Sequence, residues 1–495
     1  MIFTGNMLWL ILLLPVLGAM LSLIMPSPAA ALRLVAAGVP LIAAVDLWAV
    51  LAVFSGGTLT SGGEWLRLDA LSGYHAAVMA LVFSLSSLYA SSYFRRESAE
   101  ARLARGLARR FAALWYGALA AMTLVLLSNN LGIMWVGVEA TTLLTAFLIC
   151  LHVSAFSLEA TWKYLIVCSV GVAFAFMGVL LLAASAGTPE AGAHLLDWTY
   201  LRKMAGSLDA RLVKLSFIFL LVGYGTKAGV APMHSWLPDA HSQAPAPVSA
   251  LFSGFMLNMA LYCIMRYMPL ADAAIGYAGW LNNMLIVFGL VSILIAAVFI
   301  LSQHDLKRLL AYCSVEHIGI IMLGLGLGPL GVFAALFHTL NHSLSKALGF
   351  FAAGRLGQIY GSLDMRRIKG AVHADPLWGA GLFGGILALI GVAPFAVFMS
   401  ELLILKAAAD ARQYVVIAVF LLGTGTVFVG VLRQAVNMCW GEKPGVENDC
   451  AANGLADWLI VLAPMLVLVA LGLWMPPFFR SALEAAAGIL AEGGL

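Results

Sequence analysis

Three basic side chains recur at four-residue intervals within one apolar stretch, GVFAALFHTLNHSLSKALGFFAAG. His338, His342 and Lys346 would share one face of a helix, because residues four apart are neighbours on a helix surface. Imidazole changes its protonation state near neutral pH, and a lysine held away from water can release its proton. The pattern therefore predicts a row of groups that can pass protons.

Metal binding is the alternative chemistry for the same row. The spacing of His338 and His342 would allow it, but a lysine completes the row in place of a carboxylate. The six cysteines form no Cys-x-x-Cys pair: Cys150, Cys168, Cys263, Cys313, Cys439 and Cys450. Nucleotide-binding loops and nucleophile elbows are absent from the sequence. We therefore predict neither a metal site nor a cofactor, and buried, chemically inert cysteines.

The tetrapeptide GVAP occurs twice, at 229–232 and 391–394, each time with an ionisable residue close by. Lys227 precedes the first copy and Glu401 follows the second. Proline removes a backbone N–H and clashes with the preceding turn, so each copy should break its helix and leave carbonyls free for water or ions. A plain proline kink would explain one copy. Two identical copies beside charges favour a functional break.

Glu139 lies in the middle of another apolar stretch, LGIMWVGVEATTLL. A charge at the bilayer centre costs about 2.5–3.5 kcal/mol, so it needs a partner or a path to water. Lys227 is the natural counter-charge, and the alternative is a structural carboxylate held by the hydroxyls of Thr141 or Thr142. Lys163 is a second candidate, or it extends to the membrane interface from the start of its helix.

Further polar residues are possible relay groups. Glu316 and His317 stand near a helix start and could be inner relay residues or helix-cap partners, whereas His234 and His241, with Asp239, follow the first break and are expected to have loop roles. The complete set of possible relay residues is Asp305, Lys307, Glu316, His317, His234, His241 and Asn258.

The amino-acid composition indicates which kind of secondary structure positions these polar groups. Of the 495 residues, 62% are hydrophobic and 10% are charged, whereas soluble proteins carry about 25% charged residues. The chain is therefore expected to be an all-α polytopic membrane protein. Its net charge of +3 gives no sign of nucleic-acid binding. The run 7–25 is expected to be a retained first helix, since it lacks the basic start of a signal peptide.

Apolar spans of bilayer length predict about fourteen transmembrane helices. They lie at 7–25, 34–54, 71–93, 111–127, 131–152, 162–185, 212–231, 246–268, 279–301, 308–327, 331–354, 375–408, 414–438 and 456–478. The two GVAP breaks fall in the seventh and the twelfth. Because an odd number of helices inverts a repeat, the spacing of the breaks predicts two inverted five-helix repeats. The predicted divisions are an N-terminal three-helix segment with a basic loop, two repeats and a C-terminal helix, at 1–110, 111–268, 279–438 and 456–495.

Arginine and lysine in short loops predict the orientation. Three basic loops fall on one side, which should be cytoplasmic and would place both termini outside. They carry Arg95, Arg96, Arg102, Arg105, Arg109 and Arg110, then Lys307 and Arg308, and then Arg355, Arg366, Arg367 and Lys369. One loop disagrees, because Arg202, Lys203, Arg211 and Lys214 fall on the outer side.

Three long motifs resemble one known family. KAGVAPMHSWLPDAHSQAPAPVSALFSG, SQHDLKRLLAYCSVEHIG and FHTLNHSLSKALGFFAAG are similar to the antiporter-like subunits of respiratory complex I, membrane-bound nickel–iron hydrogenases and multisubunit Na⁺/H⁺ antiporters. The resemblance covers residues 60–440. It implies fourteen helices, two inverted repeats and proton translocation along a central hydrophilic axis.

The resemblance also implies roles for individual residues. Glu139 would pair with Lys227, the row from His338 to Lys346 would form the central path, and Glu401 would be the outlet. Asn258 stands where many members carry a lysine, so the central relay would run through water, Lys346 and the histidines. The short chain, Glu401 and Asn258 together look most like the hydrogenase-4-type component F branch.

These features lead us to expect a proton-translocating subunit of a redox-driven membrane complex that performs no catalysis by itself. Its expected partners are sister antiporter-like subunits, a peripheral nickel–iron or quinone-reducing arm and the lipid bilayer, in a bacterial or archaeal inner membrane. Three alternatives remain: a Na⁺/H⁺ antiporter subunit without a redox partner, a membrane partner in inorganic-carbon uptake, and a structural anchor. The charges inside the membrane argue against the anchor.

Overall fold

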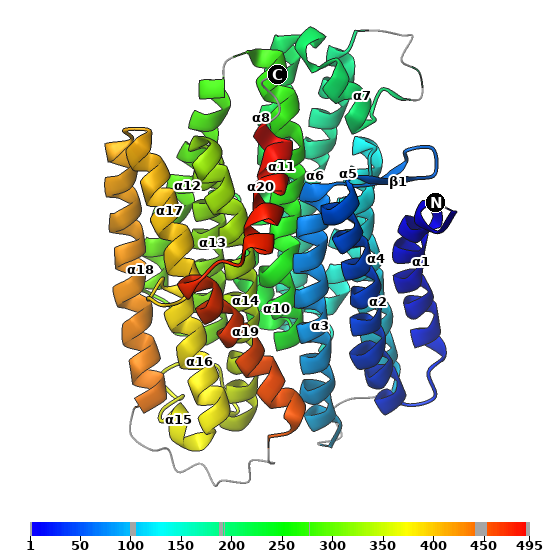
Figure 1. Ribbon diagram of the computed structural model, residues 1–495. Coiled ribbons are helices and arrows are strands. Elements are labelled where there is room, and N and C mark those ends of the chain that lie inside the picture. Colours follow the sequence, from blue (N-terminus) through cyan, green and yellow to red (C-terminus); the bar gives the residue numbers. More distant parts are fainter. Residues whose placement is uncertain are drawn as a thin grey trace.

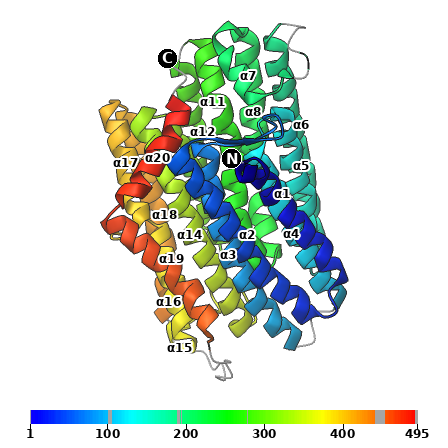
Figure 2. The same ribbon diagram turned by 45° about the vertical axis from the view of Figure 1, so that its right-hand side comes forward.

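A computed structural model shows a bundle of long helices lying side by side (Figure 1). It describes residues 2–99, 105–187, 192, 194–276, 278–440 and 453–491, so Arg102 and Cys450 lie outside the described residues. Turning the bundle by 45° shows the same closely packed array of long helices (Figure 2). The all-α membrane architecture expected from the composition is confirmed.

Eleven of the described helical segments are long and apolar enough to cross a membrane. They are α1 (Ile2–Ile24), α2 (Pro28–Gly56), α3 (Ala70–Ala99), α4 (Arg105–Leu127), α5 (Leu131–Ile149), α6 (Ala155–Ser185), α10 with α11 (Ala246–Leu251 and Leu257–Ile275), α12 (Ala278–Ile300), α13 (Leu306–Leu325), α18 (Tyr414–Trp440) and α19 (Leu455–Leu473).

Further crossings come from helices that are shorter, broken or more polar. They are α8 (Ala210–Ala228), α14 (Gly328–Tyr360) and the pair α16 (Pro376–Leu389) and α17 (Ala396–Asp410). Together with the eleven they would give the number predicted from the sequence. The total of fourteen and the inverted repeats remain predictions.

Burial separates an inner group of helices from an outer group. Almost every residue of α13 is buried, and so are most residues of α11 and α14. In contrast, α6 and α18 expose large apolar side chains such as Ile166, Val170 and Val429. Apolar surface of this kind suits contact with lipid tails or with neighbouring membrane subunits. The polar candidates of α13 and α14 are therefore shielded in the centre of the bundle.

Both GVAP copies break their helices in the same way. The first break separates α8 from α9 (Trp236–Gln243), and the second separates α16 from α17. Gly229 and Gly391 adopt left-handed backbone conformations with φ of 77° and 68°. The next residue then donates to the carbonyl five positions earlier, from Val230 to Gly225 and from Val392 to Leu387. This is a glycine-dependent helix ending, and the predicted pair of breaks is confirmed.

The basic loops meet at one end of the bundle. The backbone N–H of Leu306 donates to Leu363 O and that of Met365 to His304 O, which joins the loops before α13 and after α14. A cavity of about 390 Å³ at this end is lined by Glu97 of α3, by Lys307 and by residues of the second loop. This convergence supports the grouping of three basic loops on one side, and the assignment of that side to the cytoplasm stays a prediction.

A buried ion pair at another position was not foreseen. The hairpin of β1 (Leu59–Ser61) and β2 (Leu66–Leu68) leads into Asp69, whose carboxylate receives two hydrogen bonds of 2.6 and 2.7 Å from Arg266 of α11. Both side chains are buried. Charges desolvated in this way need close pairing, and the pair joins the hairpin to the inner helices.

The C-terminal segment corrects the sequence prediction of a single last helix at 456–478. Helix α19 ends at Leu473, and a further helix, α20 (Pro477–Ala491), follows it. Residues 474–476 separate the two, and the consecutive prolines Pro476 and Pro477 cannot supply the N–H groups that would continue α19. The α20 helix was missed because Arg480 and Glu484 interrupt its apolar pattern. In Figure 1, α20 and the start of α1 both lie in the upper half of the bundle.

Candidate functional site

Lys227 is fully buried at the end of α8, beside the first break. Its Nζ donates to Thr142 Oγ1 of α5 at 2.9 Å and to Tyr164 Oη of α6 at 2.5 Å. The ammonium also lies 4.8 Å from the centre of the Tyr164 ring, within the range of a cation–π contact. The Tyr164 hydroxyl shares a further hydrogen bond with Thr145. Three helices thus hold this lysine in a chain of hydroxyl groups.

Glu139 does not pair with Lys227 in this structure, which corrects the predicted direct ion pair. Its carboxylate accepts a hydrogen bond from Ser169 Oγ of α6 at 3.3 Å, and its second oxygen is buried without a partner. Thr142 lies one helical turn along α5 from Glu139. The Thr142 hydroxyl reaches the lysine, so it stands between the two charges along the helix face.

Lys163 lies at the basic end of the bundle and is half exposed. It forms ion pairs with Glu159 at 2.7 Å and with Asp239 at 3.0 Å, and Arg308 binds the other oxygen of Asp239. This exposed charge cluster matches the alternative in which Lys163 extends to the interface, and it is not a counter-charge contacting Glu139.

The centre of the bundle joins α11 to α14. Asn258 follows a π-helical turn (Phe252–Met256), a feature often found at functional sites. Its Nδ2 donates to Ser343 Oγ of α14 at 2.9 Å, and its Oδ1 is buried without a partner. One turn away, Lys346 is fully buried and its Nζ donates to Leu310 O of α13 at 2.6 Å. The buried hydroxyl of Ser343 and the buried amine of Lys346 therefore lie one turn apart on α14, and Asn258 of α11 contacts the first of them.

The row on α14 gains a third histidine from α13. His338 Nε2 and His317 Nδ1 are 2.9 Å apart, within hydrogen-bond distance. The His317 ring also lies 5.2 Å from the His342 ring, whose two nitrogens are buried without partners. His338 Nδ1 is bonded to Ser400 Oγ of α17 at 2.9 Å. The predicted row is thus one side of a cluster that extends across three helices.

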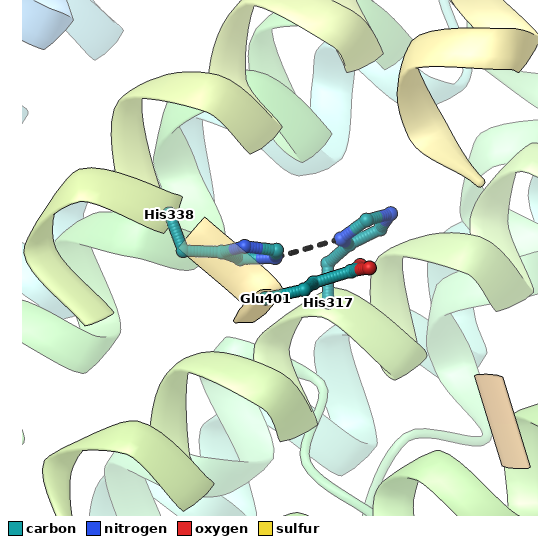
Figure 3. Close-up of side chains that lie close together, drawn as sticks. All are labelled: His317, His338 and Glu401. Carbon is teal, nitrogen blue, oxygen red and sulfur yellow. Dashed lines mark hydrogen bonds between the residues drawn. The ribbon is translucent and has the colours of Figure 1, made fainter. Parts of the chain in front are cut away.

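Glu401 of α17 completes this cluster. One ligand-type atom from each of His317, His338 and Glu401 lies within 4.8 Å of the other two. Figure 3 shows the three side chains converging, with the hydrogen bond between the two imidazoles. A Cβ at Gly391 would lie 2.4 Å from Glu401 Oε2, so the glycine of the second break leaves the space that the carboxylate occupies. We name His317, His338, His342 and Glu401 the histidine–glutamate cluster.

The remaining candidates lie at the start and in the middle of α13, on α9 and in the first break. Lys307 donates to Ala244 O at 2.6 Å, and Asp305 caps α13 by accepting from the backbone N–H of Arg308. Glu316 is buried next to His317. The expected loop role is wrong for His241, which α9 carries into the interior, where it stacks on Phe350 at 4.9 Å. His234 lies in the turn of the first break, near the ring of Tyr312.

Comparison with known proteins identifies the family of this chain. Residues 128–427 match the family model described as NADH:quinone oxidoreductase/Mrp antiporter, transmembrane. The chain belongs to this family. A hydrogenase-4 component F homolog from Methylacidiphilum infernorum is 36% identical over 417 residues, which cover 84% of this chain and 86% of that protein. The family resemblance inferred from the three motifs is thereby confirmed.

Solved structures agree on the fold. A chain of the membrane-bound sulfane sulfur reductase, an archaeal respiratory membrane complex, superposes with a TM-score of 0.86 at 24% identity, covering 98% of this chain and 97% of that one. A chain of the Mrp complex from Dietzia sp. gives 0.84 at 23% identity, covering 99% and 98%. At these identities the likeness shows the fold that this family member shares with them.

Sequence reasoning missed the hydroxyl groups that connect the ionisable residues of this family member. They are Tyr164, Ser169, Ser343 and Ser400. Serine and tyrosine are frequent in membrane helices, so their presence alone is no signal. Its position directly before Glu401 places Ser400 near the second break, but the sequence does not identify its histidine partner.

Gly391→Ala tests the contact between the second break and Glu401. The added methyl group would collide with the carboxylate, and the left-handed backbone adds about 1–2 kcal/mol of strain. We expect proton transfer to fall well below the wild-type rate in sealed vesicles. Gly276→Ala is the matched control, since Gly276 has φ of 64° but open space around it. Equal rates in the two variants would show that the contact with Glu401 is unimportant.

Proposed function

We propose that this chain is a proton-translocating membrane subunit of a redox-driven complex. The observation that carries the proposal is a succession of buried polar groups from the first helix break to the second. It runs from Lys227 with Thr142 and Tyr164, through Asn258 with Ser343, to Lys346, the histidine–glutamate cluster and the second break. Buried ionisable groups in membrane proteins mark ion pathways.

The arrangement suits stepwise proton transfer. Lys227 can hold or release a proton next to hydroxyls that both donate and accept. Lys346 and the histidines can do the same in the second half of the bundle, and charges in a poorly solvated interior repel or attract one another over several ångströms. Protonation at Lys227 would therefore favour deprotonation at Lys346, and the proton would leave through the histidines and Glu401.

Such transport needs an external source of free energy. Moving one charge against 100 mV costs about 2.3 kcal/mol. The hydrogenase-4 component F homolog supports a redox partner, because it is a relative over most of the length of both chains. We accordingly propose sister antiporter-like subunits and a peripheral redox arm as partners, and a bacterial or archaeal inner membrane with both termini outside as location. The division into 1–110, 111–268, 279–438 and 456–495 is proposed with it.

The likeness to an Mrp chain keeps an antiporter without a redox arm as the second candidate. Gentle purification from native membranes through a tag on this chain separates the two. We expect nickel- and iron–sulfur-containing proteins to co-purify, as measured by metal content and mass spectrometry. A similarly tagged unrelated membrane protein is the control. If nickel- and iron–sulfur-containing proteins are absent from an otherwise intact complex, the result would favour the antiporter or inorganic-carbon uptake and overturn the redox assignment.

A further inference from the structure

We propose that His317, His338 and Glu401 bind a divalent transition-metal ion of the zinc class. The sequence argued against a metal because the row on α14 ends in a lysine. The fold removes that objection, since α17 brings a carboxylate to the two imidazoles (Figure 3). Two histidines and one carboxylate form a common ligand set for zinc.

The spacing of the ligand atoms suits a single ion. Zinc binds imidazole nitrogen at about 2.0–2.1 Å, so the ligand atoms of a tetrahedral site lie about 3.3 Å apart. His317 Nδ1 and His338 Nε2 are already 2.9 Å apart. The three ligand atoms lie within 4.8 Å of one another, and a small rotation of the Glu401 side chain would close the site. No hydrogen bond to this carboxylate is found within the described residues, so such a rotation breaks none there.

The surroundings of the ligands are also those of a metal site. His338 turns its other nitrogen, Nδ1, to Ser400 Oγ at 2.9 Å, as metal-bound histidines turn theirs to a polar partner that fixes the tautomer. His342 is fully buried beside His317, and neither of its nitrogens has a partner. Buried nitrogens without partners are costly, although His342 lies outside the three residues whose ligand atoms are within 4.8 Å of one another. Lys346, one turn further along α14, carries a charge that opposes the metal, and the Glu401 carboxylate, as a ligand, offsets it.

Metal binding would also tie α13, α14 and α17 together next to the second break. A metal-bound imidazole nitrogen has no lone pair left to accept a proton. This blocking role, unlike the metal site itself, rests on the proposed proton path. If that path is correct, a metal ion bound at the site blocks proton transfer. The site would therefore make proton transfer sensitive to zinc.

Binding is tested on the purified complex after treatment with a chelator. Cobalt(II) is titrated in, its visible absorption is recorded, and zinc is then added to displace it. We expect the wild type to bind one more equivalent than Glu401→Gln and His338→Gln, and Ser400→Ala to bind that equivalent about 10–100-fold more weakly. His241→Gln, which removes another buried histidine without a hydrogen-bond partner, is the matched control and should bind as the wild type does. Equal binding by the wild type and Glu401→Gln, a variant of nearly unchanged shape, would overturn the site.

A measurement of proton transport distinguishes an error in the proposed metal site from an error in the proposed function. Vesicles containing the wild-type complex should lose proton transfer as zinc fills the site. Proton transfer that continues at the wild-type rate with the site filled would overturn the blocking role. Metal binding in a complex that transfers no protons through this subunit would support the site and overturn the proposed function.

Discussion

Lys346→Met is expected to abolish proton transfer through this subunit while the complex still assembles. Lys346 is fully buried on α14, and its only hydrogen bond among the described residues is to Leu310 O. Methionine has a similar length and suits an apolar helix, but it cannot carry a proton. Loss of the lysine should therefore interrupt the path between Asn258 and the histidines without leaving a cavity.

The measurement is proton uptake into sealed vesicles, driven by the redox substrate of the complex. Lys406→Met is the matched control, because Lys406 is an exposed lysine on α17 that pairs with the exposed Asp410. It should transport at the wild-type rate. Full coupled transport by Lys346→Met would remove this lysine from the pathway and leave the α14 row a structural role.

Lys227→Ala and Glu139→Gln are also expected to abolish proton transfer, with the holocomplex still formed. Removal of the lysine leaves the hydroxyls of Thr142 and Tyr164 without their cation. It also removes a positive charge close along the helix face to the Glu139 carboxylate, one oxygen of which is buried without a partner. Glu139→Gln removes the negative charge instead, and the lysine should then lose its proton. Either change stops the alternation of charge that proton entry requires.

Proton uptake is again measured in vesicles, with subunit content checked on a gel and pumping by sister subunits subtracted. Lys214→Ala is the control on the same helix, since Lys214 lies near Trp280, far along α8 from the break. Wild-type pumping by both Lys227→Ala and Glu139→Gln would leave these residues a structural role and overturn the mechanism.

The amino-acid sequence determined the features that depend on neighbours along the chain. Apolar runs of bilayer length specified the helices, and the two GVAP segments specified where α8 and α16 end, because glycine and proline act on their own turn. The four-residue spacing placed His338, His342 and Lys346 on one face of α14. The three motifs were long enough to identify the family.

Only the tertiary structure decided which groups meet across helices. Lys227 bonds to hydroxyls of α5 and α6 instead of to Glu139, Arg266 pairs with Asp69 at the end of the hairpin, and Glu401 joins His317 and His338. These contacts depend on the angle and register at which helices far apart in sequence pack. A periodicity of 3.6 residues specifies the face of one helix but not the helix that the face will contact.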